Sequence, residues 1–240
     1  MTTVAPRRML LSRPAVERLA GLAGTAAPWS TEPTPAPPDP PALAPELRDA
    51  LEVLAAPELL VDVDVAVGSD RVRAWHRFAR GRVTALATAG GRVELCWYDD
   101  DLWRLELARA VTVTTPPASA EPPPGPIDLP FELLLGTGEA VRLERDDVFG
   151  ELMGRYGAGL DAAGVRRLHT GSLGRLRAVV SGVGSSGAHR VGWVSWSLFA
   201  DGWRALTPYT SGCVAMVRVH PVDPPRLGVE VARLMTTVLS

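Results

Sequence analysis

The segment LLVDVDVAV, residues 59–67, constrains the fold of this 240-residue chain more than any other feature. Its valines fall on one face of an extended chain and Asp62 and Asp64 on the other, which is the pattern of a half-buried β-strand. Three runs with the composition of strands follow it: RVRAWHRFAR, RVTALATA and RVELCWYD. Gly90 and Gly91 separate the last two and are typical of a hairpin turn. The pattern predicts antiparallel strands whose apolar face must be covered by other elements.

The second half of the chain repeats this order. Four strand-like runs follow one another between residues 174 and 220: GRLRAVVSG, RVGWVSWSLFA, WRALTPY and CVAMVRVH. A helix closes each half, the first beginning at the acidic run 99–101, which we expect to cap it, and the second following Pro224 and Pro225. The segments RVRA and RLRA are also similar to each other, and each begins a strand.

We therefore predict an α+β fold with a central, mostly antiparallel β-sheet built from two quasi-duplicated halves and flanked by helices. Residues 1–240 are expected to form a single domain. Its internal pseudo-repeats span about 43–114 and 127–240 and are joined by a proline-rich linker.

Apolar periodicity predicts helices outside these strands as well. Ser12 is a candidate cap for a short helix, and leucines from Leu43 to Leu54 mark a second one. Further helices are predicted to begin at Asp146 or Asp147 and near Val165. We interpret the proline-rich stretches at 28–45 and 115–130 as extended surface connections.

The composition narrows the classes of partner. Net charge is −2, which provides no positive field for a nucleic acid, and no run is long enough to span a membrane. Cys96 and Cys213 lie in apolar runs and are expected to behave as small hydrophobes. All 25 basic residues are arginine, which is typical of a GC-rich bacterial genome. We expect a cytoplasmic protein.

No motif in the chain supports a catalytic, cofactor or metal site. The segment GVGSSG at 182–187 fits a dinucleotide-binding pattern, but a strand follows it instead of a helix, so we read a hairpin loop. Asp62 and Asp64 fit a solvated strand face better than a metal site. The four histidines show no zinc spacing. We predict no enzyme, no cofactor and no metal.

Aromatic residues are the strongest candidates for a binding surface. Alternation in 190–200 places Trp193 and Phe199 on one face and Trp196 on the other, while Trp75 and Phe78 also fall on opposite faces. Either the helices hide all of them, or part of the sheet is an apolar platform for a partner. We take all five as candidate partner-binding residues. We expect one of Trp193 and Trp196 to face the partner, and expect Trp203 to belong to the core.

Five segments follow one another along nearly the whole chain: LAAPELLVDVDV, GRVTALATAGGRVELCWY, LWRLELARAV, DGWRALTP and GVEVARLM. Their order resembles the EspG family, the chaperones of type VII (ESX) secretion in actinobacteria. The resemblance implies an α/β fold with quasi-two-fold symmetry and no enzymatic activity. It also implies binding of a helical PE–PPE heterodimer at the apolar tip of its PPE subunit, through the sheet and the C-terminal helical part.

Other readings remain open at the level of sequence. In another actinobacterium the client is expected to be either PE–PPE-like or a WXG100-like small helical protein. A small-molecule or enzymatic domain would instead hold a pocket between the half-sheets, with His76 or His189 among its polar groups. A third reading is a self-associating subunit whose apolar face forms a homodimer.

Overall fold

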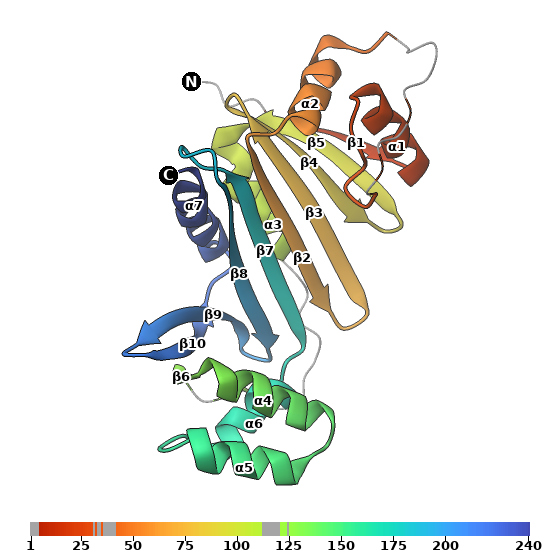
Figure 1. The fold of residues 1–240 in the computed structure, drawn as a ribbon. Helices are drawn as coiled ribbons and strands as arrows, with labels where there is room; N and C mark the ends of the chain where they lie inside the picture. The colour runs from red at the N-terminus through yellow and green to blue at the C-terminus, as the bar shows by residue number, and fades with distance from the viewer. Residues whose placement is uncertain (1–4, 31, 33–34, 36–41, 112–120, 124) are drawn as a thin grey trace.

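The residues that the computed structural model describes, 5–30, 32, 35, 42–111, 121–123 and 125–240, contribute ten strands to one antiparallel sheet (Figure 1). The order across the sheet is β1-β5-β4-β3-β2-β7-β8-β9-β10-β6. The predicted α+β class with a central antiparallel sheet is confirmed. The strands are β1 (Arg7–Leu11), β2 (Leu59–Val67), β3 (Asp70–Ala79), β4 (Arg82–Ala89), β5 (Arg92–Asp99), β6 (Ile127–Pro130), β7 (Gly174–Val183), β8 (His189–Phe199), β9 (Gly202–Ser211) and β10 (Val214–Val222).

The two halves of the chain meet at the centre of the sheet, where β2 pairs with β7 along its whole length. From this pair outward, β3, β4 and β5 lie on one side and β8, β9 and β10 on the other. Counted outward from the centre of the sheet, β2 and β7 therefore occupy equivalent positions, and so do β3 and β8. The matched words RVRA and RLRA open β3 and β7, so they lie on strands that are not equivalent. A duplication with the predicted boundaries stays a prediction.

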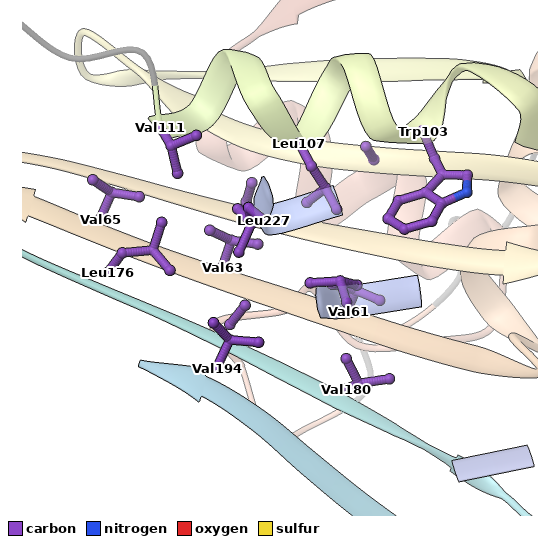
Figure 2. Packing of buried hydrophobic residues seen from close by; sticks show 14 of the residues in the cluster. Val61, Val63, Val65, Trp103, Leu107, Val111, Leu176, Val180, Val194 and Leu227 are labelled. Carbon is purple, nitrogen blue, oxygen red and sulfur yellow. The ribbon is translucent and has the colours of Figure 1, made fainter. Parts of the chain in front are cut away.

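Two helices cover one face of the sheet. They are α3 (Trp103–Val111) and α7 (Arg226–Leu239), the closing helices of the two halves. Along α3, Trp103, Leu107 and Val111 recur every four residues and point at the strands, where they meet the valines of β2 (Figure 2). This packing forms the largest buried cluster of the protein.

The opposite face is covered only at its two ends by described helices. At one end α1 (Arg13–Leu22) and α2 (Pro45–Ala55) pack on β3, β4 and β5, with Leu86 and Leu95 beneath them. At the other end α4 (Phe131–Arg142), α5 (Asp146–Tyr156) and α6 (Ala162–Thr170) gather over β9 and β10 (Figure 1). The middle of this face, on β2, β7 and β8, is left open.

Most predicted elements are present at their predicted places. The Ser12 side chain accepts a hydrogen bond from Ala15 N at 3.4 Å and caps α1 as expected. At the predicted hairpin both Gly90 and Gly91 have positive φ, of 52° and 81°, a conformation that glycine adopts without strain. No described helix is both long and apolar enough to cross a membrane.

Several expectations were wrong. A helical segment does begin at the acidic run, as a 3₁₀ turn over Asp100–Leu102 that leads into α3, but the Asp99 side chain makes no capping hydrogen bond. Cys96 is buried, but Cys213 is exposed because it lies in the turn between β9 and β10. Strand β1, strand β6 and helix α4 were not predicted, and β6 occupies the end of the second proline-rich stretch. Residues 31, 33–34, 36–41, 115–120 and 124 of the two proline-rich stretches lie outside the described residues.

Candidate partner-binding groove

Trp193 and Trp196 lie on opposite faces of β8 and have opposite environments. Trp196 is 0% exposed, and its indole Nε1 donates a hydrogen bond to Glu230 of α7 at 3.1 Å. Its ring lies 6.2 Å from that of Trp203, which is buried as predicted. Trp193 points to the open face and is 61% exposed. That Trp193 meets a partner stays a prediction.

The other three candidate residues do not join Trp193 in one surface. Phe199 is buried beneath the α4–α6 end of the sheet. Phe78 is buried on the α3 face, where its ring makes an edge contact with Trp103 at 6.0 Å. Trp75 is half-buried and packs against Trp29 at 5.7 Å. In this structure, burial leaves Trp196, Phe199 and Phe78 no surface for a partner, so the proposed site narrows to the surroundings of Trp193.

Trp193 lines an open groove of about 490 Å³ between the middle of the sheet and α4. Four strands and one helix form its walls, and most of the side chains are apolar. The lining residues are Phe131, Leu134, Leu135, Arg177, Val179, Val191, Trp193, Ser195, Leu206, Pro208 and Val217. Several of them are large and exposed, including Leu135 at 58% and Val191 at 54%. An apolar groove of this size with one guanidinium in its wall is typical of a surface that binds another molecule.

The groove lies where two neighbouring strands separate. Strands β8 and β9, both described throughout, pair over only four residues each, from Trp196 to Phe199 and from Gly202 to Ala205. Beyond Ala205, β9 continues beside β10 alone. Pro208 lies in this part of β9, and proline is tolerated in a sheet mainly where a strand has no partner on one side. The parting of the strands opens a gap that α4 borders.

The histidines of the alternative reading do not converge on a reactive site. His76 is buried on the α3 face, and its Nδ1 lies 3.0 Å from the Tyr98 hydroxyl. Burial, with a smaller contribution from Arg77, lowers the pKa of His76 to about 4. His189 is exposed at the start of β8. Because the two side chains occupy different environments on different strands, they form no common pocket.

Two further hollows, of about 250 and 480 Å³, lie beside α2. Two ion pairs lie at their walls, Arg7 with Glu46 and Arg82 with Asp49 at 2.7 Å. Among the described residues, no three histidine, cysteine, aspartate or glutamate side chains gather as metal ligands would. The groove beside Trp193 is therefore the site whose lining is most suited to a macromolecular partner.

A comparison with protein families matches residues 39–233 to the EspG family. The chain belongs to the EspG family. The family expected from the order of segments in the sequence is thus confirmed. Among curated protein sequences, none matches this family member.

This EspG family member is also similar to a solved structure, that of the Mycobacterium tuberculosis type VII secretion system chaperone EspG5 in complex with a PE25–PPE41 dimer. The TM-score is 0.66 at 16% sequence identity, and the match covers 98% of this chain and 97% of that chain. The two proteins therefore share a fold over their whole length.

The groove was only partly predictable. Alternation along residues 190–200 puts Val191 on the same strand face as Trp193, and both residues line the groove. The wall formed by α4 was missed because no helix was predicted over residues 131–142. A signal was present in FELLLG, where Phe131, Leu134 and Leu135 recur at helical spacing.

Proposed function

We propose that this EspG family member is a chaperone of type VII secretion that binds a helical, PE–PPE-like client through the groove beside Trp193. Membership of the family supports the chaperone role, as does the likeness to EspG5, which is described as a type VII secretion chaperone in complex with a PE25–PPE41 dimer. We place this activity in the cytoplasm, where secretion clients are held before export, and assign it no chemical step.

The observation that carries this proposal is the exposure of Trp193 in an apolar groove. Because Trp193 is 61% exposed, its burial by a partner would lower the free energy of the complex. Tryptophan is also among the residues that most often dominate binding energy. Leu135 of α4 and Val191 of β8 are exposed beside it and extend the apolar area. A client with an apolar helix end would bury these groups, and its own apolar residues would be shielded from aggregation.

The shape of the site leaves room for the end of a helical client. The groove is open and runs between α4 and the sheet, so we expect the end of a helical pair to lie against α4. We favour a PE–PPE-like pair over a WXG100-like protein because EspG5 is described in complex with a PE–PPE dimer.

The decisive experiment is capture of the client from the cytosol of the source organism by the immobilised full chain, with identification by mass spectrometry. We expect the wild type to retain a PE–PPE-like helical pair and Trp193→Ala to lose it. Leu105→Ala is the control, because Leu105 is 67% exposed on α3, on the other face of the sheet. This variant should capture the client as well as the wild type does.

Other results would redirect or refute the proposal. Recovery of a WXG100-like protein would keep the chaperone role and change the client. If the wild type captured no helical protein and sedimented as a dimer that Trp193→Ala dissociates, the groove would be a self-association surface and the proposal would be wrong. Equal loss of capture in Trp193→Ala and Leu105→Ala would remove the groove from the binding site.

A further inference from the structure

The open middle of the sheet carries an excess of positive charge. On the face shared with Trp193, β3 and β7 contribute five arginines and β2 contributes Asp62 and Asp64. The arginines are Arg71, Arg73, Arg77, Arg175 and Arg177. Their side chains share one face because each occupies an alternate position on its strand. The surface therefore carries three more positive than negative charges.

Both carboxylates on this face are already paired. Asp62 accepts a hydrogen bond from Arg77 Nη1 at 2.5 Å. Asp64 accepts one from Arg71 Nε at 2.7 Å, and this bond is the main reason why the pKa of Asp64 is lowered. Asp64 is therefore ionised at neutral pH, and its charge offsets that of Arg71.

Three further guanidinium groups have no carboxylate of their own, because Asp64, which lies opposite Arg73 and Arg177 in the sheet, is bound by Arg71. Arg73 lies 4.0 Å from Asp64, which is already bound by Arg71. Arg175 and Arg177 form no ion pair within the described part of the chain. Both are exposed. Such groups are available to an anion from outside.

Arg177 is the member of this set that reaches the groove. It lies in the groove wall with Trp193, since Val179 pairs with Trp193 across β7 and β8 and Arg177 pairs with Ser195 one step further along. Among the described residues that line the groove, none is acidic. A guanidinium beside an apolar surface gives up part of its hydration when a partner covers it, so a carboxylate at that place is favoured over a neutral group.

We propose that the groove selects a helix end in which a carboxylate flanks the apolar residues, and that Arg177 pairs with this carboxylate while Trp193 contacts the apolar residues. This inference rests on the proposed function, because it names the chemistry of the client at the same groove. Arg73 and Arg175 lie further from the groove and add to the positive field that orients an acidic client on approach.

A protein partner fits these observations better than a nucleic acid does. A strand of nucleic acid needs a basic track along its phosphates, whereas this groove has a single guanidinium among mainly apolar side chains. The chain as a whole carries a net charge of −2, which repels a polyanion.

The test uses two synthetic helical hairpins, each with a pair of leucines at its turn, that differ at one flanking position, glutamate in one and lysine in the other. Binding of each fluorescein-labelled hairpin to the full chain is measured by anisotropy, with a labelled oligothymidine as a third probe. The variants are Arg177→Gln, Arg177→Glu and Trp193→Ala. Arg233→Gln is the control, because it removes the same charge from the exposed side of α7 on the other face.

We expect the wild type to bind the glutamate hairpin about tenfold more tightly than the lysine hairpin, as for a hydrogen bond to a charged group. Arg177→Gln should bring the ratio close to one, and Arg177→Glu should reverse it. Trp193→Ala should weaken both hairpins by a similar factor, and Arg233→Gln should leave the ratio unchanged.

Three results would overturn the inference, and they differ in what else they affect. Equal binding of both hairpins by the wild type would remove the role of Arg177 and leave the groove as a site for helix ends. Failure of both hairpins to bind would refute the groove as such a site, while the capture experiment would still test the chaperone role. Oligothymidine binding more tightly than either hairpin would assign the face to a polyanion.

Discussion

Replacing each of the two neighbouring tryptophans of β8 by alanine should have very different effects on stability. Trp196 is fully buried, and removal of a buried tryptophan costs about 3–5 kcal/mol. The variant also leaves Glu230 without its indole donor; because Glu230 is only half-buried, water can replace that hydrogen bond and the added cost is about 1 kcal/mol. Trp193 is 61% exposed, so its replacement loses about two-fifths of a full burial, roughly 1 kcal/mol.

Urea unfolding followed by far-ultraviolet circular dichroism measures this difference without relying on tryptophan fluorescence. With a slope of about 3 kcal/mol per molar urea, the midpoint should fall by more than about 1 M for Trp196→Ala and by about 0.3 M for Trp193→Ala. Trp196→Phe is a milder variant that keeps most of the ring packing. It should lie between the two.

Similar midpoint shifts for Trp193→Ala and Trp196→Ala would refute this reasoning. Such a result would mean that the open face of β8 is covered in solution, by a second copy or by residues outside the described part of the chain. The groove would then not be free for a client.

Three further predictions concern other parts of the protein. The folded state keeps His76 neutral to about pH 4 while the unfolded chain takes up a proton near pH 6.5, so stability should fall as pH drops through this window, by about 2 kcal/mol at pH 5. In urea titrations at a series of pH values, the free energy of unfolding of His76→Phe should depend less on pH than that of the wild type. An unchanged pH dependence would contradict this role of His76. A Cβ at Gly192 would lie 2.9 Å from Leu234 Cδ2 of α7, the end of a side chain that can shift, so Gly192→Ala should lower the thermal midpoint by only about 2–4 °C, and a rise would contradict that packing. A thiol reagent should label Cys213 in the native protein, whereas Cys96, whose pKa burial raises to about 12, should react only on unfolding.

Elements that depend on local periodicity could be predicted from the sequence. The alternation in β2 and the leucine and valine stripe of α7 both identify the element and the side that faces the core. Trp193 and Trp196 mark the limit of this reasoning, because alternation separates the faces of β8 without saying which face a helix covers. That choice depends on the course of α7, which packs on the Trp196 side.

The helical signal at the start of α4 is weakened by glycines that serve tertiary packing. Gly136 and Gly138 lower the helix propensity of its sequence. A Cβ at Gly136 would come within 2.9 Å of Leu152 of α5, and one at Gly138 within 3.1 Å of His169 of α6. The glycines allow three helices to approach closely, a reason that lies outside the segment itself. Because α4 was not predicted, only the part of the groove formed by the sheet could be expected from the sequence.

The short pairing between β8 and β9 divides the sheet into two mechanical parts. Beyond the four residue pairs that join these strands, the outer part consists of β9, β10, β6 and the helices above them, while the inner part holds the main core. Insertions or deletions in the hairpin of β9 and β10 would change the shape of the groove and leave the valines of β2 undisturbed, whereas the turn at Asp201 and Gly202 is tied to the main core by Trp203. Relatives of this chain can therefore differ around the groove and still keep the same folded core.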